Sequence, residues 1–231
     1  MSNRLRMAPR IALPAVLIVL AGCVRLWGGG SAGSARPNKV ARPRVSAQLL
    51  AVFPQRVGTV WRYDGYAEYG HEMQLRAVRR SAGKVVHEIT GAVADVSSGE
   101  STRDFRFALQ YVFHPDEVRE RILRADTPFP HRLGDLVLLR LPLKQGSSWR
   151  QTVRAGGRAK SVQAVILAAG ERDGAREYTV RYRTPMAGKP GGVYEEIRVF
   201  RAGVGVVWFE NTFGSSPEER FNYALFAMER R

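Results

Sequence analysis

A strict alternation of apolar and polar side chains is the feature that most restricts how this chain can fold. Between Asp104 and Tyr111, the odd positions carry Phe, Leu or Tyr and the even positions carry Asp, Arg, Ala or Gln. The same period of two recurs at 177–183 and 193–200. Successive side chains of a β-strand point to opposite faces, so this pattern predicts half-buried strands.

Several further segments have strand character, and their connections are short. Turn sequences such as Arg172-Asp173-Gly174 and Ala155-Gly156-Gly157 favour antiparallel neighbours, because parallel strands need long crossovers. We expect an all-β fold, an antiparallel meander of about eleven strands that forms a barrel, a half-barrel or two packed sheets. Helix is expected only at 45–52, while 116–125 could be helix or strand. The further predicted strands are 59–66, 71–80, 85–93, 136–141, 148–155, 161–169, 204–211 and 221–228.

The chain also resembles itself. Phe53–Arg62 aligns with Leu141–Arg150, 88 positions later, with proline, a basic residue, glycine, tryptophan and arginine at the same spacing. This match predicts one β domain, 45–231, built from two related halves, 53–140 and 141–231. We interpret the motif as structural, because glycine permits a turn and tryptophan starts a strand with a large core-facing side chain.

The N-terminus has the order of an export signal. Arg4, Arg6 and Arg10 are followed by the apolar run 11–20. The uncharged stretch 11–24 is shorter than the roughly 20 residues of a spanning helix.

That run ends in Leu20-Ala21-Gly22-Cys23, which resembles the lipobox of bacterial lipoproteins. The resemblance implies removal of residues 1–22 and attachment of lipid to Cys23, which would fix the protein to a membrane. An ordinary secretory signal and an uncleaved N-terminal anchor are the alternatives. Cys23 is the only cysteine, so no disulfide can form within one chain.

Residues 23–44 are predicted to form a flexible basic tether, rich in glycine, serine and proline. Gly29–Gly33 fits the nucleophile pattern G-x-S-x-G but lacks the strand and helix that the motif needs. Signal and tether together carry eight of the fifteen excess positive charges, which leaves +7 on 45–231. An exported protein would seldom meet nucleic acid, so we expect anionic lipids or envelope polymers as partners. An arginine-rich genome would explain the charge equally well.

The lipobox, F-P-x-x-x-G-x-x-W-x-Y at Phe53–Tyr63 and G-V-G-V-V at Gly203–Val207 together resemble a group of poorly characterised bacterial envelope lipoproteins. The resemblance implies an exported protein, anchored on the outer face of the cell membrane or in an outer membrane. It assigns no binding or catalytic residue. The Gly203-Val204-Gly205 step is expected to shape a turn or a bulge.

Side chains that could carry chemistry are scattered. His71, His87, His114 and His131 show no metal-ligand spacing, so neither a metal nor a cofactor is expected. His71-Glu72 and His87-Glu88 place each pair on opposite strand faces. The segment 114–117 is interpreted as a solvated turn. The remaining acidic residues considered are interpreted as surface groups rather than as a paired acid and base: Asp95, Glu100, Glu195 and Glu196.

These observations predict a non-enzymatic envelope lipoprotein that binds an apolar or amphipathic ligand, or a protein partner. A scaffold that contacts anionic lipids or polymers is the alternative, and an enzyme is a third. An apolar cavity of roughly 300 Å³ or more would favour a ligand carrier, and a filled interior would argue against one.

Overall fold

The structure is a computed structural model that describes residues 44–65, 69–95, 105–126, 133–155, 157–186, 191–213 and 220–230, all within one compact unit, Ala41–Arg231. The predicted signal, Cys23, most of the predicted tether, His131 and Glu100 lie outside the described residues. The elements are α1 (Ala47–Leu50), β1 (Thr59–Asp64), β2 (Tyr69–Ser81), β3 (Lys84–Asp95), β4 (Phe105–Phe113), β5 (Glu117–Ala125), β6 (Leu136–Arg140), β7 (Ser148–Ala155), β8 (Arg158–Arg172), β9 (Ala175–Pro185), β10 (Val193–Arg201), β11 (Gly205–Phe213) and β12 (Arg220–Arg230).

The all-β prediction is confirmed, with twelve strands instead of about eleven. The additional strand is β5, in the segment for which the sequence left helix and strand open. The expected short helix is α1, where the Ser46 hydroxyl oxygen accepts a hydrogen bond from the Gln48 amide at 3.2 Å. This contact satisfies an amide at the helix start that has no partner within the helix. Across the described ranges, no helix has the length and apolar character to cross a membrane.

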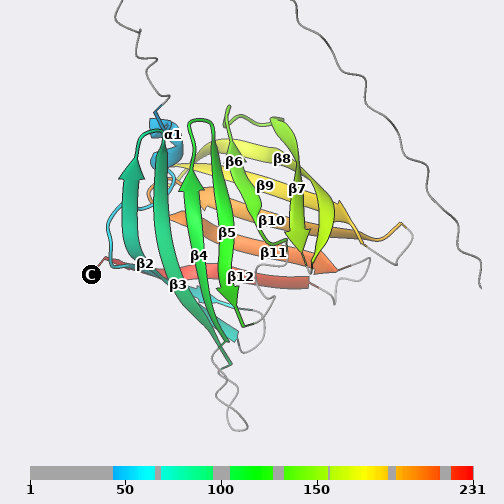
Figure 1. The fold of residues 1–231 in the computed structure, drawn as a ribbon, viewed down its shortest axis with the longest axis horizontal. Coiled ribbons are helices and arrows are strands. Elements are labelled where there is room, and N and C mark those ends of the chain that lie inside the picture. Colours follow the sequence, from blue (N-terminus) through cyan, green and yellow to red (C-terminus); the bar gives the residue numbers. More distant parts are fainter. Residues whose placement is uncertain are drawn as a thin grey trace, which may run out of the picture. The chain divides into compact units, whose positions relative to one another are not determined.

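All twelve strands belong to one sheet in the order β6-β5-β4-β3-β2-β1-β12-β11-β10-β9-β8-β7. Strands that follow one another in the chain pair antiparallel, except β6 and β7, and β1 pairs with β12. The first and last strands of the meander therefore meet in the middle of the sheet. Figure 1 shows β2 to β5 running upright in front of β9 to β12, which run across behind them. The sheet therefore curls into a nearly closed barrel with β6 and β7 as its two edges.

The edges β6 and β7 meet through a side chain rather than through a backbone ladder. The Gln151 amide on β7 accepts a hydrogen bond from the Val137 N–H at 2.6 Å and donates one to the Val137 carbonyl at 3.2 Å. The Tyr182 hydroxyl donates to the next carbonyl of β6, that of Leu138, at 2.5 Å. Unpaired edges are costly when buried, so these side chains substitute for a missing strand partner.

The two copies of the repeated motif adopt the same local conformation. Gly58 and Gly146 have φ angles of 87° and 82°, in the left-handed region that favours glycine. Each donates its N–H at 2.8 Å to a carbonyl of the second strand that follows it, that of Leu75 in β2 or Ile166 in β8. Both motif tryptophans are buried, as the structural interpretation predicts. Duplication of the two halves stays a prediction.

The core lies inside the barrel, between the inward faces of two walls, one formed by β2 to β5 and the other by β9 to β12 (Figure 1). Phe53, which follows α1, packs there against Tyr111 of β4 and Phe200 of β10, with ring centroids 5.0 and 6.0 Å apart. The Gly203–Gly205 segment forms the predicted turn, and its amides donate to the carbonyls of Ala51 and Val52. Phe53 and these two bonds hold the α1 segment against one end of the barrel, which we call the α1 end.

Candidate functional site

Three charged side chains lie in the middle of the barrel. Arg198 of β10 donates two hydrogen bonds to Glu120 of β5, at 3.0 and 3.1 Å, and one from its Nε to Glu196 at 2.6 Å. The Tyr194 hydroxyl donates to the second oxygen of Glu196 at 3.0 Å. All of these side chains are buried, so the arginine links the two walls through a two-point ion pair.

The prediction for Glu196 is therefore wrong. Glu195 and Glu196 do lie on opposite faces, and Glu195 contacts Arg183 on the outside at 3.1 Å. Glu196, in contrast, faces the interior and is 0% exposed. Burial raises the pKa of Glu196, and Arg198 opposes that shift. Burial alone would lower the pKa of Arg198, but the two glutamates raise it well above its ordinary value, so the arginine stays charged.

Aromatic rings fill the space around this cluster. Phe209 lies beneath the Arg198 guanidinium, with 5.2 Å from its ring centroid to Cζ. His71 stacks on Tyr63 at 5.1 Å and meets the edge of Tyr223 at 5.1 Å. The cavity that these side chains leave has a volume of about 10 Å³, the space of about one water molecule. The part of the interior around Arg198 therefore has no room for an apolar ligand.

His87 is a second buried histidine, at the α1 end of the interior. Its Nε2 lies 3.3 Å from the Gln55 side-chain oxygen, which also accepts a hydrogen bond from Arg80 at 2.9 Å. Burial, together with the positive charge of Arg80, lowers the pKa of His87 to about 4. The imidazole is therefore neutral at neutral pH. Its neighbour Glu88 faces outward and pairs with Arg79, so the predicted separation of histidine and glutamate is confirmed.

A groove of about 460 Å³ opens at the α1 end. One side of the groove is formed by α1 and the segment after it, which contribute Gln48, Ala51 and Val52. The other side is formed by the β6–β7 loop, the start of β9 and the start of the β10–β11 turn. The floor contains the largely buried Val52, Leu143 and Tyr178. Apolar floors with a few polar groups at the rim are typical of small-molecule sites, which occupy roughly 300–1,000 Å³.

Two cations stand at this groove. Lys144 comes from the β6–β7 loop and Arg176 from the start of β9, and both side chains are exposed. Neither forms an ion pair with any carboxylate among the residues that the structure describes. Two carboxylates of neighbouring strands are bound by other arginines: Glu117 by Arg140 and Arg119, and Glu177 by Arg201. Glu171 lies opposite Arg176 in the β8–β9 ladder but forms no ion pair with it. The groove thus combines an apolar floor with two cations that form no ion pair with a described carboxylate.

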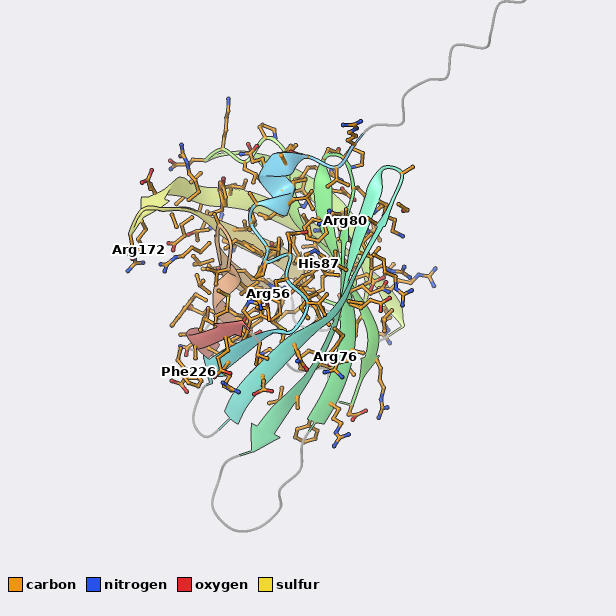
Figure 2. All side chains as sticks on the ribbon, turned by 90° about the vertical axis from the view of Figure 1, so that its left-hand side faces the viewer. Arg56, Arg76, Arg80, His87, Arg172 and Phe226 are labelled. Atoms are coloured by element: carbon orange, nitrogen blue, oxygen red, sulfur yellow. The ribbon has the colours of Figure 1, made fainter. Side chains whose placement is uncertain are left out.

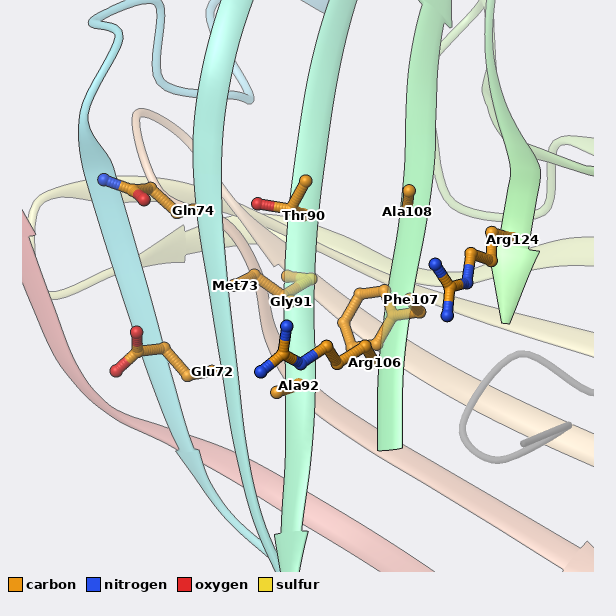
Figure 3. Close-up of a pocket in the computed structure, with 10 residues that line it drawn as sticks. All are labelled: Glu72, Met73, Gln74, Thr90, Gly91, Ala92, Arg106, Phe107, Ala108 and Arg124. Carbon is orange, nitrogen blue, oxygen red and sulfur yellow. The ribbon is translucent and has the colours of Figure 1, made fainter. Parts of the chain in front are cut away.

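A second depression, of about 470 Å³, lies on the outer face of β2 to β5. Figure 3 shows Glu72 and Gln74 on one side and Arg124 on the other, with Thr90, Gly91 and Ala92 between them and the Arg106 side chain extending over the middle. Gly91 lies opposite Phe107 in the strand ladder, and a Cβ at Gly91 would come within 2.2 Å of that ring. Two of its charged groups have partners, since Glu72 pairs with Arg62 and Arg124 with Asp126, while Arg106 forms no ion pair with a described carboxylate.

Comparisons with protein-family models and with curated proteins give no match. Two solved structures resemble this one. They are crystal structures of a candidate lipoprotein from Parabacteroides distasonis and of a candidate exported protein with a YmcC-like fold from Bacteroides fragilis. Each is 10% identical in sequence, has a TM-score of 0.49, and covers 77% of this chain and 98% of its own. A likeness at this level carries no argument about function.

The residues singled out from the sequence do not converge on one site. His71 and His87 lie inside the barrel in separate environments. The segment 114–117 does form a turn, in which the His114 N–H donates to the Glu117 carbonyl at 2.8 Å. The solvated interpretation is wrong for Glu117, which is buried and paired with Arg119 and Arg140. In the described ranges, no group of three or more histidines, cysteines and carboxylates could hold a metal ion. The alternation did not reveal the Glu120, Glu196 and Arg198 cluster. The repeated motif contains Lys144 as its basic residue but was interpreted as structural, and no motif contains Arg176.

Proposed function

We propose that this chain is a non-enzymatic cell-envelope lipoprotein, anchored through lipid on Cys23, that binds an amphipathic anionic ligand in the groove at the α1 end. One observation carries the binding role: Lys144 and Arg176 lie exposed beside an apolar floor, without an ion pair to any described carboxylate. A head group such as a phosphate or carboxylate would supply the missing counter-charge. An alkyl tail would cover Val52, Leu143 and Tyr178, at about 0.8 kcal/mol for each buried methylene group.

The interior supports the same choice by elimination. A carrier that encloses its ligand needs an empty barrel, and the middle of this barrel holds paired charges and aromatic rings around a cavity of about 10 Å³. We therefore place ligand binding at the end of the barrel rather than inside it.

Calorimetric titration with decyl phosphate, kept below its micelle concentration, tests the groove. The expected result is saturable binding that weakens about tenfold or more in Lys144→Ala/Arg176→Ala. Decanol, which has the same tail and no charge, should bind far more weakly. The matched control is Arg158→Ala/Lys160→Ala, which removes two cations from the β7–β8 hairpin at the opposite end of the barrel. Equal affinity in all three proteins would contradict the proposal.

Intact mass and membrane fractionation test the anchor separately. The protein from a lipoprotein-processing bacterium should carry a diacylglycerol mass on a chain that begins at Cys23, and Cys23→Ser should lose both the lipid and membrane association. A wild-type chain of unmodified mass would contradict the lipid anchor but would leave the proposal of ligand binding in the groove unaffected.

A further inference from the structure

Three more cations lie at the α1 end. Arg56 follows the helix, while Arg80 and Lys84 flank the β2–β3 hairpin. Gln55 connects Arg80 to the helix, because it accepts from Arg80 at 2.9 Å and donates to the Leu50 carbonyl at 3.1 Å. Figure 2 shows Arg80 beside the helix and Arg56 on the segment that leaves it. We call Arg56, Arg80 and Lys84 the basic rim.

The basic rim has no counter-charge within the described chain. Arg56 and Arg80 are exposed, Lys84 is half-exposed, and none of them forms an ion pair with a described carboxylate. The nearest strand carboxylate in the ladder, Glu88, is engaged by Arg79 through two hydrogen bonds, at 2.7 and 3.3 Å. A cluster of like charges without partners destabilises a protein slightly, and it attracts an anionic surface.

The covalent connection to Cys23 reaches the domain at the same end. The described chain begins at the exposed Arg44, immediately before the Ser46 cap of α1. The stretch 24–43 spans at most about 70 Å even when fully extended. A lipid on Cys23 would therefore keep the α1 end within that distance of the membrane that contains the lipid.

We infer that the basic rim docks the α1 end on an anionic lipid surface, the membrane that holds Cys23. This inference rests on the lipid anchor of the proposed function but not on ligand binding in the groove. Basic residues near an anionic leaflet each strengthen association by roughly fivefold. The attraction acts over about 10 Å at 0.1 M salt, so it favours the docked orientation only while the anchor keeps the domain near the surface. The docked orientation would also bring the mouth of the groove close to the head groups.

Energy transfer to labelled lipids tests the orientation in the full lipidated protein. Cys23 is the only native cysteine and would be blocked by lipid, so Ala82→Cys labels the rim hairpin and Ala159→Cys labels the opposite end. In vesicles of phosphatidylcholine with 30% phosphatidylglycerol, we expect clearly greater transfer from position 82 than from position 159. Pure phosphatidylcholine or 0.5 M sodium chloride should abolish the difference.

Charge reversal identifies the responsible surface. Arg56→Glu/Lys84→Glu should lower the preference for anionic vesicles at least tenfold, and Arg80→Gln, which keeps a donor for Gln55, should lower it severalfold. Arg154→Glu/Arg158→Glu, at the far end, should leave it unchanged. Equal transfer from both positions in a protein shown by mass to be lipidated would overturn the docking inference alone. An unlipidated mass would instead overturn the anchor, and with it this inference.

Discussion

The charges inside the barrel and those at its α1 end follow opposite rules. Arg198, in the interior, uses three hydrogen bonds on two glutamates and is 3% exposed. Lys144 and Arg176, at the α1 end, have no described carboxylate partner and face solvent. A buried charge must be paired because it has lost its hydration, whereas an exposed charge stays hydrated and can bind an external partner. This contrast supports our proposal that the interior serves stability and the α1 end serves binding.

Removal of Arg198 should produce the largest effect. Arg198→Met leaves Glu120 and Glu196 buried without a cation, which should cost about 3–5 kcal/mol of unfolding free energy at pH 7. Urea denaturation measures this loss of unfolding free energy. The all-apolar control Glu120→Leu/Glu196→Leu/Arg198→Met should recover most of the loss, since a buried group of paired charges and a packed apolar core differ little in stability. If the single variant were as stable as wild type, the interior would be far more hydrated than its geometry indicates.

The pH dependence of His87 should be the next largest effect. Its pKa of about 4 in the folded state lies below the ordinary 6.5, so the unfolded chain binds the proton first as the pH falls. The stability that the neutral histidine supplies is complete above about pH 6.5 and declines toward pH 4, by roughly 3 kcal/mol. Comparison of wild type with His87→Phe isolates this contribution from the acid titration of carboxylates. Parallel stability curves for the two proteins from pH 7 to pH 4 would contradict the prediction.

Loss of the Gln151 amide should cost less. Gln151→Leu leaves the N–H and carbonyl of Val137 without their partner at the buried β6 edge, which should lower the unfolding free energy by about 2 kcal/mol. Gln151→Glu tests the geometry, because it keeps the acceptor and loses the donor. Hydrogen exchange at β6 should accelerate in Gln151→Leu more than at β3, and uniform acceleration would argue against a local role.

The groove cations should have the smallest effect on folding. Lys144→Ala/Arg176→Ala should change the unfolding free energy by less than about 0.5 kcal/mol, because neither side chain has an internal partner. The same variant is expected to lose ligand affinity. A loss of stability above 1 kcal/mol in urea would show that these cations belong to the structural framework after all.

The sequence predicts the strands well because alternation is a property of neighbouring residues. It predicts the sites poorly because each site combines residues that are far apart in the sequence. On β10, both faces carry mixed side chains, with Val193, Glu195 and Ile197 on one and Tyr194, Glu196 and Arg198 on the other. The face with the arginine turns inward because Glu120 neutralises it from 78 residues away, a pairing that no local pattern contains. Lys144 and Arg176 likewise line one groove only because the β6–β7 loop and the start of β9 lie beside α1.

The central claim, that binding occurs at the α1 end and not within the barrel, is tested most directly by residue-resolved NMR during a titration with decyl phosphate. The amides of Ala51, Lys144 and Arg176 should shift in a saturable manner, while the interior amides of His71 and Tyr223 should remain unchanged. Shifts centred on His71, Tyr223 and Arg198, with the α1 end unaffected, would contradict the account.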